Sequence, residues 1–128
     1  IPGDELADLY ARASVFWHLC GLYQRDPARV EHFGMTTVEA MQAGAVPVVF
    51  DGGGQREIVE EGRSGRRVST VHGLIEATQA LLTDAATRQA LAAGAIARAA
   101  AFTGDRFARD VQTLFDPIME WLCGKSSV

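Results

Sequence analysis

Hydrophobic and polar positions alternate between two patterns over the first 70 residues. Short unbroken apolar runs at about 14–18 and 46–50 predict strands that are covered on both faces. Apolar residues at helical spacing predict helices at about 5–13, 36–44 and 55–61. A third short strand is expected at about 67–70. Helices and buried strands in alternation predict an α/β fold, with a Rossmann-like parallel sheet and helices on both faces.

Beyond residue 70 the pattern is helical only. The first helix after residue 70 is predicted by residues that share one face: Leu74, Ile75, Thr78, Leu81 and Leu82. An alanine-rich helix is expected at about 86–101, where Gly94 costs about 1 kcal/mol relative to alanine. A helical C-terminal tail at about 105–122 carries an apolar stripe from Phe107 to Trp121, which we interpret as a core face packed on the sheet.

Capping residues indicate where the predicted helices begin and end. Asp4 is a candidate N-cap for the first helix. Thr36 and Glu39 have the T-x-x-E spacing of a capping box, and Gly44 is expected to end that helix at C′. Three glycines at 52–54 predict a turn after the second strand. They do not complete the G-x-G-x-x-G pattern of a dinucleotide-binding loop, because Glu57 stands where the third glycine of that pattern would be.

Composition and charge limit the classes of protein. The 128 residues are 48% hydrophobic, which fits one folded domain, and a net charge of −4 argues against a nucleic-acid partner. The apolar runs are too short for a transmembrane segment. Cys20 and Cys123 lack the spacing of a zinc site, which favours a reducing, cytoplasmic setting. Because the chain starts at Ile1, we expect it to be a piece of a longer protein.

The most informative segment runs from Glu31 to Glu39. Gly34 lets a ligand approach the backbone, and the helix that follows it offers unpaired N–H groups and a positive dipole end, which together bind phosphate. The carboxylates of Glu31 and Glu39 lie on either side of this segment. They can accept hydrogen bonds from neutral hydroxyl groups, as an acidic residue does from the hydroxyls of ribose. A phosphate cradle between hydroxyl acceptors predicts a sugar-nucleotide site.

These residues also resemble a known family. Residues 31–44 read EHFGMTTVEAMQAG, and they are followed by VPVVF and GGGQREIVEEG. The run is similar to the C-terminal, donor-binding domain of retaining GT-B glycosyltransferases of family 4. The likeness covers about 1–68 and is strongest over 31–62. It implies that the chain is a single, truncated nucleotide-sugar-binding domain, and that the donor is a nucleotide-diphosphate sugar.

The resemblance implies roles for individual residues. Glu39 would hold the ribose hydroxyls, and Glu31, the predicted catalytic residue, would contact the transferred sugar. The backbone around Phe33, Gly34, Met35 and Thr36 would meet the sugar and the diphosphate. Helix N–H groups rather than a metal would stabilise the leaving group, so no cofactor and no metal are expected. The chain contains no D-x-D motif, which agrees with this expectation.

Two departures from the family pattern bear on the acceptor. An insertion at about 19–30 is expected to border the acceptor side, with His18, His32 and Gly53 as candidate rim residues. The strands that carry the family's basic pair, and the N-terminal domain that binds the acceptor (a sugar, a lipid or another small molecule), precede this chain. We therefore expect the fragment to be inactive alone.

Other interpretations stay open at this point. In isolation Glu39 is explained as a capping residue, and Glu31 as a solvated loop charge. If the last helix crosses to another domain instead of packing on the sheet, Trp121 and Leu122 would be exposed and favour self-association. A peripheral location at the inner membrane face also fits. The alternative functions are a non-catalytic GT-B-like binding or assembly domain and a GT-B sugar-nucleotide epimerase.

Overall fold

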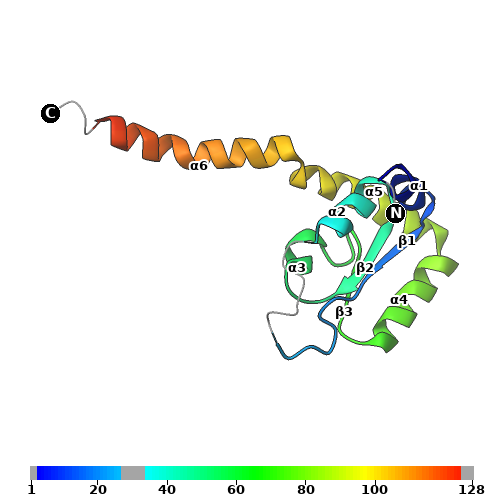
Figure 1. The fold of residues 1–128 in the computed structure, drawn as a ribbon. Coiled ribbons are helices and arrows are strands. Elements are labelled where there is room, and N and C mark those ends of the chain that lie inside the picture. The colour runs from blue at the N-terminus through cyan, green and yellow to red at the C-terminus, as the bar shows by residue number, and fades with distance from the viewer. Residues whose placement is uncertain (1–2, 27–33, 125–128) are drawn as a thin grey trace.

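A three-stranded parallel sheet lies at the centre of the computed structural model, which describes residues 3–26 and 34–124 (Figure 1). Its strands are β1 (Val15–His18), β2 (Val46–Phe50) and β3 (Arg66–Val68), in the order β1-β2-β3. In the register of the sheet, Val15 lies opposite Val46, and Val48 lies opposite Arg66. The predicted parallel sheet is confirmed, and its third strand begins one residue earlier than expected.

Helices connect and cover the strands, as the helical periodicity predicts. They are α1 (Gly3–Arg12), α2 (Met35–Gln42), α3 (Gln55–Ile58), α4 (Val71–Thr83), α5 (Ala85–Ala99), the 3-10 helix η2 (Ala100–Phe102) and α6 (Gly104–Gly124). Helix α3 is shorter than its prediction because the chain turns extended at Val59 (φ −98°, ψ 118°). Among the described residues, no helix combines the length and the apolar character that crossing a bilayer requires.

The two faces of the sheet support two separate parts of the core. On one face, Val49 packs with residues of α2, α3 and α5, including Met41, Ile58 and Ala95. On the other face, residues of α4 and α5 pack on Val46 and Val48. Because β2 is covered on both sides, its apolar run has no alternation. The expected arrangement of helices on both faces is therefore confirmed.

The start of α2 differs from the predicted capping box. Gly34 is the N-cap, no side chain caps the helix, and Thr36 lies inside its first turn. The T-x-x-E spacing was misleading because Gly34 adopts a left-handed conformation that starts the helix two residues earlier. Asp4 likewise lies in the first turn of α1 rather than before it.

The end of α2 agrees with its prediction. Gly44 is left-handed at φ 87°, and its N–H donates to the carbonyl of Met41 at 3.0 Å. The N–H of Ala45 donates to the carbonyl of Ala40 at 3.0 Å, which completes a Schellman motif. This motif returns the chain directly into β2.

Helix α6 does not pack on the sheet, so the interpretation of its stripe as a core face is wrong. Figure 1 shows α6, coloured orange to red, extending away from the strands. Phe115 and Trp121 are 53% and 59% exposed. Amphipathic spacing specifies a face that can be buried, but it does not specify the partner that buries it.

Gly94 lies inside α5 because the helix makes a close approach to the loop after α3. A Cβ atom at this position would lie 1.9 Å from the carbonyl oxygen of Arg63. The cost of glycine in a helix is therefore offset by packing that no larger residue permits.

We expect Gly94→Ala to lower the free energy of unfolding by about 1–3 kcal/mol, although alanine favours the helix, because the backbone of the loop must move. Urea denaturation of the full-length protein measures this change. Gly104→Ala is the matched control, since nothing lies within 4 Å of its added Cβ. It should leave stability unchanged or raise it slightly. Equal effects at both positions would contradict the close approach at Gly94.

Candidate functional site

The candidate site lies where the parallel strands end and α2 begins. β1 ends at His18, and α2 opens with Gly34 at the same edge of the sheet. β2 ends at Phe50, and α3 begins at this edge after the turn 51–54. Ligands of open parallel sheets bind outside the carboxyl ends of the strands. The fold therefore places the start of α2 where a ligand is expected.

Gly34 is held against α3 with no room for a side chain. Its φ of 63° and ψ of 32° are left-handed. A Cβ atom there would lie 2.6 Å from Cδ1 of Ile58 and 2.9 Å from Nε2 of Gln55. Both the conformation and the contact require glycine. The position of the α2 opening is thus fixed by α3.

The opening of α2 presents backbone donors. The N–H groups of Thr37 and Val38 donate to the Gly34 carbonyl at 3.0 and 3.2 Å. Within the described ranges, the N–H groups of Met35 and Thr36 have no backbone acceptor, and both residues are exposed. Unpaired N–H groups at the positive end of a helix dipole attract an anion. This part of the phosphate-cradle hypothesis fits the geometry, and ligand binding by Met35 and Thr36 stays a prediction.

Gln55 and His18 form a polar pair beneath the opening. Gln55 is fully buried, and its Nε2 lies 3.3 Å from Nδ1 of His18. Its Oε1, and also Oγ1 of the buried Thr37, have no hydrogen-bond partner among the described residues. Buried polar atoms without partners are uncommon, and they often mark functional sites. Gln55 was not predicted from the sequence, because nothing in its local pattern shows that it packs under Gly34.

Glu39 contacts α1, whereas Gly34 lies against α3. The hydroxyl of Tyr10 in α1 donates to its Oε2 at 3.5 Å, a long bond, and the carboxylate is exposed. Glu39, Tyr10 and Gln42 line a groove between α1 and α2. Glu39 caps no helix end, so the capping interpretation is wrong, while its role in donor binding stays a prediction. Glu31, His32 and Phe33 lie outside the described residues.

A second, more apolar cleft lies on the α3 side of the opening. Its lining includes Met35, Gly54, Glu57 and Phe102. Gly53, with φ 54°, lies exposed in the turn before Gly54, and its place at the rim of the site stays a prediction. Gln55 thus links Gly34 to His18, since it contacts both. Met35 and Gly54 of the glycine turn line the same cleft. Glu39 lies on the α1 side instead.

Burial and the nearby Glu39 carboxylate both raise the pKa of Tyr10 above its usual 10.0. Because the folded state holds the phenol neutral, this contribution to stability is present below the unfolded pKa and is lost as pH rises through the folded pKa. We expect Glu39→Gln to lower the pKa of Tyr10 and to reduce that loss.

An NMR titration of the Tyr10 ring, assigned with Tyr10→Phe, measures this pKa in the full-length protein. Gln42→Ala is the control, since it changes the same groove without removing a charge. A pKa that is unchanged in Glu39→Gln would show that the two side chains do not interact.

A comparison with protein-family models identifies a family for this chain. The model described as glycosyl transferases group 1 matches residues 1–98 of the 128. A search of curated proteins found no match. The matched region contains the sheet and the openings of α2 and α3, whereas α6 lies beyond it. Since the model covers well over half of the chain, this protein belongs to the group 1 glycosyltransferase family, whose activity is sugar transfer between a nucleotide-sugar donor and an acceptor.

Proposed function

We propose that this chain is the donor-binding part of a retaining, metal-independent glycosyltransferase of family 4, and that it forms part of the C-terminal domain of a GT-B enzyme. The substrate class is a nucleoside diphosphate sugar, with a hexose as the transferred group. The observation that carries the proposal is the opening of α2. There Gly34 is held against α3, and the amides of two exposed residues, Met35 and Thr36, have no backbone acceptor among the described residues.

The amides of Met35 and Thr36 are proposed to bind the donor diphosphate. During transfer, the bond between the anomeric carbon and the diphosphate oxygen breaks, and negative charge grows on the leaving group. Donors that are already oriented stabilise this charge without rearranging, which is worth a few kcal/mol in a site shielded from water. Helix N–H groups would thereby supply the electrostatic stabilisation that a metal ion provides in other enzymes.

Carboxylates are proposed to bind the hydroxyl groups on either side of the diphosphate. Glu39 lies about one turn into α2 and is exposed, so its carboxylate can accept hydrogen bonds from the ribose hydroxyls. Tyr10 would then orient this carboxylate rather than compete for it, since its single donor leaves other acceptor positions open. Glu31 would accept hydrogen bonds from the transferred sugar.

The acceptor is proposed to bind outside this chain. A sugar, a lipid or another small molecule would be held by an N-terminal domain. The new glycosidic bond between the transferred sugar and the acceptor would then form in the cleft between two domains. The 128 residues alone should therefore bind a donor weakly and transfer no sugar.

We expect Glu39→Ala in the full-length protein to raise the dissociation constant of the donor about tenfold or more. A hydrogen bond to a charged group is worth about 1.5–3 kcal/mol, and about 1.4 kcal/mol corresponds to a factor of ten. Calorimetry with UDP-glucose and GDP-mannose, together with UDP and GDP, measures the affinity.

Tyr10→Phe is the matched control, because it removes the contact with Glu39 but keeps the carboxylate. If Glu39 binds ribose, Tyr10→Phe keeps an affinity close to the wild type. If both variants lose affinity equally, Glu39 acts only through α1. Product analysis with donor alone and with acceptors tests the reaction: an epimerised donor would indicate an epimerase, and binding without any product would indicate a non-catalytic domain.

A further inference from the structure

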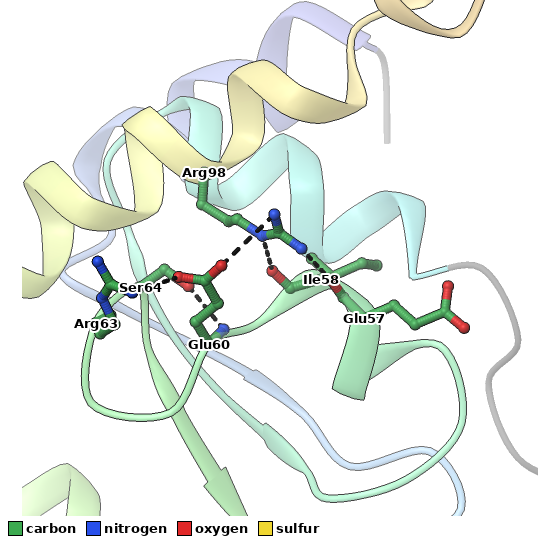
Figure 2. Close-up of polar contacts among 6 residues, drawn as sticks. All are labelled: Glu57, Ile58, Glu60, Arg63, Ser64 and Arg98. Carbon is green, nitrogen blue, oxygen red and sulfur yellow. Dashed lines mark hydrogen bonds and ion pairs between the residues drawn. The ribbon is translucent and has the colours of Figure 1, made fainter. Parts of the chain in front are cut away.

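Arg98 projects from α5 onto the carboxyl end of α3 (Figure 2). Its Nε donates to the carbonyl oxygen of Ile58 at 3.2 Å, and its terminal nitrogen NH2 donates to the carbonyl oxygen of Glu57 at 2.5 Å. These are the last two carbonyls of a helix that is four residues long. A helix end leaves its final carbonyls without partners in the helix, and here one guanidinium group satisfies both.

The same guanidinium group also contacts the opposite wall of the apolar cleft. Its Cζ atom lies 5.0 Å from the ring centroid of Phe102, within the range of a cation–π interaction. Glu57 and Phe102 both line the cleft, together with Met35 at the start of α2. One side chain therefore holds α3 on one side and η2 on the other.

Further contacts fix Arg98 in place. It forms an ion pair with Glu60, drawn as a dashed line in Figure 2, in which NH1 lies 3.6 Å from Oε1. The backbone N–H of Glu60 donates to Oγ of the buried Ser64 at 2.9 Å, which anchors the loop. One turn earlier on α5, Gly94 makes its close approach to the same loop. The guanidinium group is thus held by an ion pair and two carbonyls, and the close approach at Gly94 fixes the helix that carries it.

Helix α3 transmits this position to the opening of α2. Its last two residues are bound by Arg98, and its first residue, Gln55, lies under Gly34. The side chain of Ile58 also contacts the place where a Cβ of Gly34 would lie. A shift of α3 would therefore move the surface on which the opening rests.

We propose that Arg98 is a positioning residue for the donor site: it holds α3 and Phe102 at a fixed separation, and through Gln55 and Ile58 it fixes the opening of α2. The role in donor binding rests on the proposed function, whereas the effect on the α2 opening can be measured without a ligand. Lysine cannot replace arginine here, because one ammonium group does not match two carbonyls and an aromatic face together.

The test compares Arg98→Lys with Arg88→Lys in the full-length protein. Arg88 is the matched control, since it lies on the same helix and its NH1 also donates to a helix carbonyl, that of Leu81 at 2.7 Å, on the side of α4. Both variants should lower the melting temperature by a similar, small amount. Only Arg98→Lys should speed amide hydrogen exchange about tenfold at Thr37, Val38 and Val59, which report on the α2 opening and on α3.

In the same comparison, Arg98→Lys should raise the dissociation constants of UDP-glucose or GDP-mannose about tenfold, and Arg88→Lys should not. Wild-type exchange rates at Thr37 and Val38 in Arg98→Lys would overturn the proposal, as would equal losses of affinity in both variants. If the wild-type protein binds none of these nucleotides, the proposed function fails. The exchange rates at these two amides then decide alone whether Arg98 positions the opening.

Discussion

The contact between Gly34 and α3 is the constraint on which the candidate site depends. At this point the backbone of one helix opening touches the side chains of another, with no space for a Cβ atom. The contact is possible because Gly34 adopts a left-handed conformation, which also sets the first residue of α2. The direction of the first amides of α2, which have no backbone acceptor among the described residues, and the burial of Gln55 both follow from it. The phosphate-binding site that we propose at this place would therefore be a product of packing between α2 and α3.

Helix α5 contacts both helices that form the candidate site, α2 and α3. Its residues Ala95 and Ala99 pack in the core together with Val38 and Met41 of α2. Its Arg98 binds the end of α3. Small residues and one long cationic residue on a single helix thus contact both α2 and the carboxyl end of α3. The family match runs through residue 98, so it includes nearly all of this helix, while α6 extends beyond both the match and the sheet.

The sequence predicted what depends on local patterns. Unbroken apolar runs identified β1 and β2, and Gly44 identified the end of α2, because burial on two faces and a left-handed C′ residue leave local signals. The start of α2 was predicted wrongly, since the backbone of Gly34 and not the side chain of Thr36 begins the helix. Gln55 and Arg98 were missed because their roles come from contacts between distant segments. The exposure of α6 was not predictable from its stripe.

The most direct test of the account is the position of a bound diphosphate. A crystal structure of the full-length protein with a nucleoside diphosphate, or an amide NMR titration with the same ligand, locates it. The account predicts phosphate oxygens within hydrogen-bond distance of the amide nitrogens of Met35 and Thr36, with the largest shift changes at these two amides. A diphosphate bound elsewhere, with the opening of α2 left free, would contradict it.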